Sequence, residues 1–201
     1  MGRGFYRVSV PGTALVCGQL PRVDYADCYR AVFRTTRLGA AEWDVDAVAH
    51  AFFGTGIPGR VRIIPTARRR LGLKSAGVGK EDPNAWNDRI EVGKTKGNWP
   101  VTERSEHEIV FRVADHHVEW AFSLRVIDIE TVRLVDAITV VQFHGWLGRL
   151  YFLPVRPFHR MIVPAHMRHV MRAVRAASAR GRFADTAGPG QSVRSAAAPR
   201  S

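Results

Sequence analysis

The side chains best suited to chemistry lie in two histidine-containing stretches. Asp115, His116 and His117 stand together at the start of a strongly alternating segment, and His144 ends the next apolar run. A carboxylate beside an imidazole orients the ring and raises its basicity, as a general acid–base pair requires. A structural role is the alternative: Asp115 would bond turn amides, His117 would lie on a polar sheet face, and His144 would bridge a strand–helix corner.

Further polar groups follow His144 in a segment with helical spacing. Tyr151 and His159 are eight residues apart and therefore near one face, so Tyr151 could donate its hydroxyl to a ligand carbonyl or lie in the core with that hydroxyl satisfied. Arg156 and Arg160 are four residues apart. They could clamp a carboxylate or phosphate, or simply be solvated.

Motifs for several other chemistries are missing from the sequence. Neighbouring residues such as His116 and His117 point to opposite faces of a strand, and no spacing supplies a third ligand, so we expect no metal site. The chain has no nucleophilic serine elbow, phosphate-binding glycine loop or dinucleotide fingerprint. We therefore expect no cofactor. Two cysteines are too few for a disulfide framework, and this favours a reduced, cytoplasmic protein.

The formal net charge of +12 attracts anionic partners. Zinc spacings, helix-turn-helix patterns and aromatic RNA-binding signatures are missing, so we expect no specific nucleic acid partner. The most apolar stretch, Thr139–Val163, contains three arginines and is not expected to span a membrane. Surface attachment to a membrane through the C-terminal helix is less favoured, because its apolar residues occupy positions that core packing would use.

Periodicity and breaker residues predict the order of elements. A first strand at 24–35 is followed by an amphipathic helix at 41–53, a weaker helix from Pro58 to Gly72, and a loop at 77–87. Strands are predicted at 89–92, 101–103, 108–113, 117–126 and 132–144, with a turn at 128–131 between the last two. From Gly145 a helical pattern with internal prolines predicts a kinked or split helix.

The segment from His117 to Val126 has the clearest pattern. Its apolar residues share one parity, and its polar residues share the other, which is typical of a half-buried antiparallel strand. Trp120 belongs to the apolar set and is expected to be largely buried against the C-terminal helix. Segregated helices and strands in this order predict an α+β fold. We assign 1–22 to an N-terminal extension, 23–177 to the folded domain and 178–201 to a disordered basic tail.

Three blocks carry a resemblance to a known family: V-D-Y-A-D-C-Y at Val23–Tyr29, A-D-H-H-V-E-W at Ala114–Trp120, and the long block Val140–Val163. Together they resemble an uncharacterised bacterial family of unknown function, stand-alone or fused to epimerase-like domains. That family looks like a branch of the START and polyketide-cyclase-like superfamily. The resemblance implies a helix-grip fold: a curved antiparallel sheet wrapped around a long C-terminal helix, with two short helices after strand one and a hydrophobic cavity.

The resemblance implies that the chain binds a small hydrophobic ligand, as a carrier or sensor. The alternative is a cofactor-independent cyclase, aromatase or dehydratase acting on a polyketide-like or terpenoid-like substrate. Asp115, His117 and His144 would then move protons, and we expect them to converge with Tyr151 on one cavity. The segment Gly77–Thr102, with Trp86 and Trp99, departs from the family pattern, so any ligand-specific loop is expected there. The expected ligand-binding residues are Trp120, Phe122, Leu124, Phe143, Tyr151, Arg156, Phe158 and His159.

Overall fold

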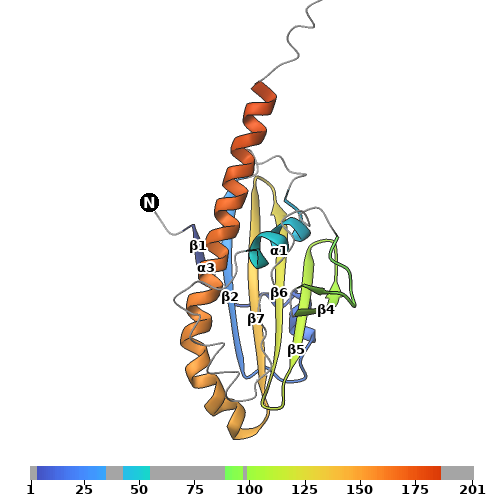
Figure 1. Cartoon of the computed structure of the whole chain (residues 1–201), viewed down its shortest axis with the longest axis vertical. Coiled ribbons are helices and arrows are strands. Elements are labelled where there is room, and N and C mark those ends of the chain that lie inside the picture. Colours follow the sequence, from blue (N-terminus) through green and yellow to red (C-terminus); the bar gives the residue numbers. More distant parts are fainter. Residues whose placement is uncertain (1–3, 35–42, 55–88, 97–98, 187–201) are drawn as a thin grey trace, which may run out of the picture.

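The structure is a computed structural model, in which residues 4–34, 43–54, 89–96 and 99–186 are described, with side chains up to residue 176 (Figure 1). The predicted helix from Pro58 to Gly72 and the predicted loop at 77–87 lie outside these residues. The same holds for the part of the predicted tail after Thr186.

Seven antiparallel strands form one sheet in the order β1-β2-β7-β6-β5-β4-β3. The first long strand, β2, therefore lies between the edge strand β1 and the last strand, β7. The strands are β1 Phe5–Val8, β2 Tyr25–Arg34, β3 Thr95–Lys96, β4 Trp99–Arg104, β5 Glu108–Ala114, β6 Val118–Ile129 and β7 Val132–Phe143.

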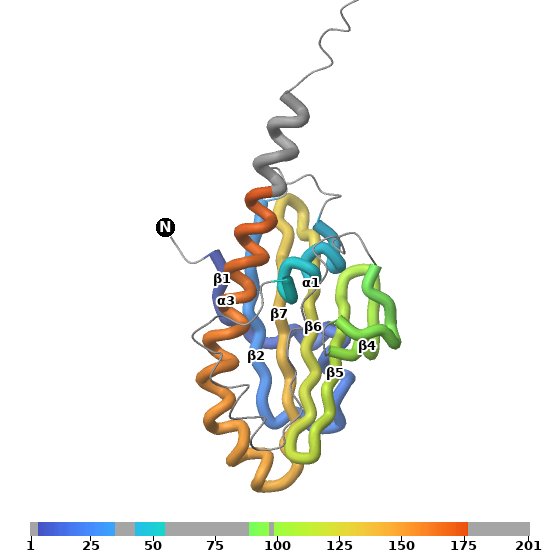
Figure 2. The backbone as a smooth tube through the Cα atoms, viewed as in Figure 1, coloured from blue at the N-terminus to red at the C-terminus, as the bar shows by residue number. Residues whose placement is uncertain are grey.

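Within the described residues, two α-helices cover one face of this sheet: α1 at Val45–Phe53 and α3 at Gly145–Thr186. Asp44 caps α1 by accepting a hydrogen bond from the Ala47 amide at 2.9 Å. The long helix α3 runs along β2 and β7, and α1 lies over β5 and β6 (Figures 1 and 2). The predicted α+β class, with an antiparallel sheet and a long C-terminal helix, is confirmed.

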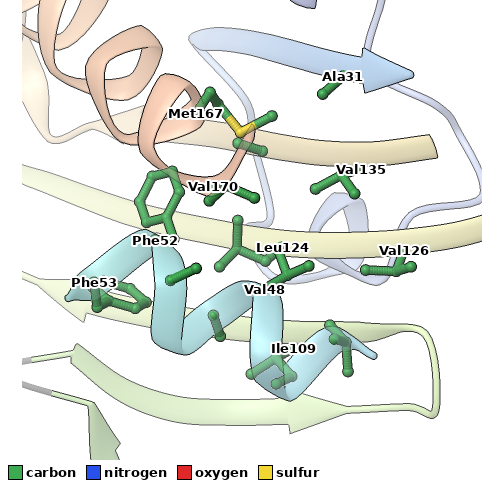
Figure 3. Packing of buried hydrophobic residues seen from close by; sticks show 14 of the residues in the cluster. Ala31, Val48, Phe52, Phe53, Ile109, Leu124, Val126, Val135, Met167 and Val170 are labelled. Atoms are coloured by element: carbon green, nitrogen blue, oxygen red, sulfur yellow. The ribbon is translucent and has the colours of Figure 1, made fainter. Parts of the chain in front are cut away.

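The buried face of each helix meets the sheet in a common core (Figure 3). Phe53 of α1 packs on Phe111 of β5 with 5.0 Å between ring centroids, whereas the Phe52 ring extends toward Met167 and Val170 of α3. Leu124 lies between them and is fully buried. The core therefore packs both helices against the side of β6 that carries its large apolar side chains, as the sequence indicated.

The opposite face of the sheet is covered by the N-terminal segment. The 3-10 helix η1, Leu15–Gly18, places Val16 against this face, and Glu108 accepts hydrogen bonds from the amides of Leu15 (3.0 Å) and Val16 (3.3 Å). Because of this cover, Ser123 is buried although it belongs to the polar parity of β6. Residues 1–22 were assigned to an extension, but β1 pairs with β2 and η1 packs on the sheet.

Three sequence predictions differ from the structure. The strand predicted at 89–92 is wrong: Ile90 instead donates its amide to Asp46 at 2.8 Å, and the short strand β3 comes after a turn. The helix predicted to be kinked or split is one continuous helix despite its internal prolines, and Figure 2 shows it curving through its first half. It also continues to Thr186, so the disordered tail predicted from residue 178 is wrong for 178–186.

The start of α3 is fixed against the hairpin between β5 and β6. His144 donates its amide to the His117 carbonyl at 2.8 Å, and Gly145 turns the chain with a φ of +72° that favours glycine. A Cβ on Gly148 would lie 2.2 Å from the same carbonyl. Glycine at this position therefore lets the helix backbone approach the hairpin.

Candidate functional site

Asp115 and His117 lie in the β5–β6 hairpin. The Asp115 carboxylate accepts a hydrogen bond from the His116 amide at 2.7 Å, and the Asp115 amide donates to the Val118 carbonyl at 2.9 Å. These contacts match the turn-stabilising role that the sequence left open for Asp115. His117 contributes its carbonyl to the contact with His144 described above, so the backbone brings the two predicted stretches together.

The His144 side chain belongs to the outer face of the sheet. Its Nε2 lies 3.9 Å from a carboxylate oxygen of Glu119, which also forms an ion pair with Arg112. Glu119 has the opposite parity to Trp120 on β6, and Trp120 faces α3. The structure therefore does not bring His144 into the same site as Tyr151, which packs beside Trp120.

A polar cluster that the sequence analysis did not select lies on the inner face, between β2 and α3. Asp27 is 2% exposed, and its carboxylate accepts a hydrogen bond from the Tyr25 hydroxyl at 2.6 Å. His159 Nε2 lies 3.2 Å from the other carboxylate oxygen of Asp27. The His159 side chain is 12% exposed, whereas the Asp27 side chain is completely covered.

The surroundings of Asp27 keep it ionised. Burial alone would raise the pKa of Asp27, but the hydrogen bond and charge of His159 and the Tyr25 hydroxyl outweigh it, so the pKa lies below its ordinary value. Burial and the neighbouring carboxylate raise the pKa of Tyr25, which holds its phenol proton as a donor. The cluster is thus a buried carboxylate that accepts from a phenol and an imidazole.

Aromatic rings enclose this cluster on the side of the helix start. The Phe152 ring lies 4.8 Å from Tyr25, 5.3 Å from Trp120 and 5.0 Å from Phe143, between ring centroids. The Trp120 ring is 6.1 Å from that of His159. Trp120 is therefore packed against α3 as expected, although it is only partly buried. The site combines an apolar wall with one anchored charge.

Two further polar side chains are buried on the same inner face. Thr139 is the direct cross-strand partner of Asp27, and His166 follows His159 by seven residues on α3. Among the described residues, neither Thr139 Oγ1 nor the two ring nitrogens of His166 have a hydrogen-bond partner of normal geometry. Burial lowers the pKa of His166 to about 4, with the nearby charge of His169 acting in the same direction. Buried polar atoms without partners call for a physical explanation, and a bound molecule is one.

The other residues expected to bind a ligand are dispersed. Phe122 and Leu124 lie deeper in the core, where the Phe122 ring contacts Phe52 at 5.0 Å between centroids. Phe158 is on the exposed side of α3. Arg156 is exposed but places its guanidinium 5.5 Å from the centroid of the Tyr25 ring. Of the expected ligand-binding residues, Trp120, Phe143, Tyr151, Arg156 and His159 thus border the cluster around Asp27.

The signal for Asp27 was present in the sequence. It lies inside V-D-Y-A-D-C-Y, one of the three blocks that carried the family resemblance, and it shares strand parity with Tyr25 and Tyr29. A carboxylate between two tyrosines on the inner face of a central strand must be buried and partnered. Its partner His159 lies 132 residues later, and no local pattern connects the two.

Among the described residues, no group of three or more histidine, cysteine and acidic side chains has a geometry that could hold a metal ion. Within the same residues, no helix is both long and apolar enough to cross a membrane.

Comparisons with known proteins place the chain in a family. A crystal structure of CalU16 from Micromonospora echinospora is 14% identical and aligns over 77% of this chain and 86% of that chain, with a TM-score of 0.29. A search of curated proteins finds no match. The model of a family described as a protein of unknown function (DUF2867) matches residues 19–166, well over half of the chain. The chain therefore belongs to the DUF2867 family of proteins of unknown function.

Proposed function

We propose that the protein binds a small, largely apolar ligand on the inner face of the sheet, beside the Asp27–His159 pair. The observation that carries this proposal is a buried carboxylate, held by a phenol and an imidazole, next to a wall of aromatic rings. Ligand sites typically combine an apolar lining with a few directed polar groups. The Thr139 hydroxyl, which has no hydrogen-bond partner among the described residues, would give such a ligand a further hydrogen-bonding group.

A second candidate function is proton transfer on the same ligand, as in a cofactor-independent cyclase or dehydratase. The Asp27–His159 contact favours it, because a carboxylate that accepts from one ring nitrogen holds the proton there and orients the ring, which leaves the other nitrogen as a proton acceptor. His159 Nδ1 makes no hydrogen bond to a described residue. In this scheme His159 moves the proton and Asp27 positions the ring, in place of the hairpin residues expected from the sequence.

Binding is tested with a neutral apolar fluorophore, N-phenyl-1-naphthylamine, titrated into the full chain while energy transfer from tryptophan is measured. Trp120 lies in the wall of the site, whereas Trp146 is exposed on the outer side of α3. We expect saturable binding whose energy transfer falls sharply in Trp120→Phe and stays the same in Trp146→Phe. Binding without any dependence on Trp120 would refute the proposed location.

The two candidate functions are separated once native mass spectrometry of the purified chain has identified a co-purifying molecule. The variant His159→Gln is then compared with the wild type for binding and for chemical conversion of that molecule. Retained binding with conversion lost by about a hundredfold or more indicates general acid–base catalysis. If the wild type binds the co-purifying molecule and does not convert it, the result indicates a carrier or sensor.

A further inference from the structure

The first half of α3 has apolar side chains on the side that faces away from the sheet. Trp146 is 71% exposed and Leu153 is 65% exposed. With 100° between successive residues, these two and four other exposed apolar residues project within roughly 140° of one another, on one face of the helix. We call this set the outer stripe; it consists of Trp146, Leu147, Leu150, Leu153, Phe158 and Met161.

The outer stripe has a sharp end. After Met161 the outward positions of α3 are taken by Arg168, Arg172 and Arg175, which are all exposed. The stripe therefore occupies the helix from its start to Met161, a length of roughly 25 Å at 1.5 Å per residue. Scattered exposed apolar residues are ordinary, but six large ones gathered on one face of one helix are typical of an interaction site.

Arginines line one edge of the outer stripe. With 100° between successive residues, Arg149, Arg156 and Arg160 project within roughly 40° of one another, between the stripe and the buried side of the helix. All three are exposed. From Gly145 to Ala184 the sequence contains no acidic residue. Up to Ala184 this helix therefore presents apolar and cationic groups from its own residues and no anionic group.

We propose that the outer stripe docks on the surface of a membrane containing anionic phospholipids. The helix would lie in the plane of the interface, with its leucines and Trp146 at the acyl boundary and the arginine edge among the headgroup phosphates. The sequence analysis gave these apolar residues to the core, but the structure exposes them, which removes the reason for disfavouring surface attachment.

A second copy of the chain is a poorer occupant of the stripe. In an antiparallel pairing of two such helices about a twofold axis, the arginine rows of both copies would lie along the same edge. The like charges would repel, and α3 has no carboxylate near the stripe to compensate them. A lipid surface supplies the phosphate groups that the arginines lack within the helix.

Vesicle co-sedimentation of the full chain tests the apolar part of the proposal. Vesicles of phosphatidylcholine alone are compared with vesicles containing phosphatidylglycerol. We expect binding mainly to the anionic vesicles, with a partition coefficient about tenfold or more lower in Leu150→Gln/Leu153→Gln. The control Val92→Gln/Ile129→Gln changes two exposed apolar residues outside the stripe and should bind as the wild type does. Thermal unfolding checks that each variant is folded.

The charged part is tested by Arg149→Gln/Arg160→Gln against Arg172→Gln/Arg175→Gln. Both pairs lower the net charge equally on the same helix, but only the first lies at the edge of the stripe. We expect Arg149→Gln/Arg160→Gln to weaken vesicle binding more than Arg172→Gln/Arg175→Gln does. The binding that remains should also depend less on the salt concentration. A blue shift of Trp146 emission on vesicle binding, lost in Trp146→Phe, would place the indole at the interface.

Three outcomes would overturn the proposal. If Leu150→Gln/Leu153→Gln binds anionic vesicles as well as the control Val92→Gln/Ile129→Gln does, the chain adsorbs through its net charge alone. No binding to anionic vesicles would exclude a lipid surface. A dimer in sedimentation velocity that Leu150→Gln/Leu153→Gln converts to a monomer, without vesicle binding, would assign the stripe to a second copy of the chain.

Discussion

Asp27 is an ionised group in a place where water cannot reach its side chain. The desolvation of a carboxylate costs several kcal/mol, and Tyr25 and His159 offset that cost with a hydrogen bond each. A buried charged pair of this kind does not by itself indicate a stabilising role, because apolar residues of similar size in its place often give a protein of equal or greater stability. Its position on the inner face, beside the aromatic wall, therefore favours a role in binding or catalysis.

Removing one partner of this pair tests how strongly the two residues depend on each other. We expect His159→Gln to lower the free energy of unfolding by about 3–5 kcal/mol, because it leaves Asp27 charged and buried. In Asp27→Asn/His159→Gln the loss should be smaller than the sum of the two single losses. Urea denaturation of all four proteins measures this coupling. His117→Gln in the hairpin is the control, and additive effects would contradict the pairing.

His166 gives the protein a pH dependence with a definite sign. Its folded pKa of about 4 lies below the ordinary histidine value, so the unfolded chain binds the proton more readily. Its contribution to stability is complete above about pH 6.5 and is lost as the pH falls toward 4. We expect the wild type to lose about 2 kcal/mol more than His166→Leu between pH 7 and pH 5. The exposed His116→Gln should follow the wild-type profile, and parallel profiles for His166→Leu would disprove the assignment.

At the scale of elements, the corner between β7 and α3 sets the position of the site. The helix starts at Gly145, and its first turn rests on the His117 carbonyl. Phe152 and His159 come two and four turns later, at seven-residue spacing on the inner side. A shift of the corner would therefore move both residues relative to Tyr25 and Asp27.

The close approach at Gly148 makes this corner sensitive to one methyl group. In Gly148→Ala the new Cβ would meet the His117 carbonyl at 2.2 Å, and backbone must move to relieve the clash. We expect a loss of about 1–3 kcal/mol in thermal or urea unfolding, together with weaker binding of the fluorophore. Gly18→Ala is the matched control, because no atom lies within 4 Å of its Cβ position. Equal stability of the two variants would show that the helix start can adjust freely.

Elements with a strong internal period were predictable, and elements without one were not. The parity of β6 and the spacing in α1 indicate which side chains join the main core, and the structure agrees with both. The half-buried state predicted for β6 is wrong, because the N-terminal segment covers its other side and buries Ser123 as well. The prediction of a strand at 89–92 was wrong because the backbone there hydrogen-bonds to side chains. The Ile90 amide donates to Asp46, and the Ile90 carbonyl accepts from Arg104 at 2.7 Å. Those partners come from distant segments, which local periodicity does not report.

At the scale of the whole molecule, the sheet is a middle layer. The helices cover one face, and the N-terminal segment covers part of the other. Leu20 and Val16 bury themselves against Ile138 and Val140 of β7, while Glu108 of β5 holds the start of η1. The segment is therefore a structural part of the domain.

Truncating one side chain in this layer checks that conclusion. Leu20→Ala should lower the free energy of unfolding by about 2–5 kcal/mol, because Leu20 is almost fully buried. Val23→Ala, three residues later and exposed, should change it by less than about 0.5 kcal/mol. A Leu20 variant as stable as the Val23 variant would return residues 1–22 to the status of an extension.

The candidate site was harder to predict than the fold. The sequence singled out His159, Tyr151 and Trp120, which do border the cluster, but it gave the catalytic role to residues near the hairpin. Adjacent acidic and imidazole groups such as Asp115 and His116 are conspicuous in a sequence, although in the structure they stabilise a turn. The pair that is brought together by folding is separated by most of the chain.

That separation has a consequence during synthesis. Asp27 leaves the ribosome 132 residues ahead of His159, which is roughly 7–26 s at ordinary rates of translation. For most of that interval the nascent chain has neither β7 to pair with β2 nor α3 to cover the inner face, so Asp27 stays hydrated and β2 lacks its neighbouring strand. The proposed ligand site is thus among the last features to be completed, and a ligand that recognises it would recognise only a fully folded molecule.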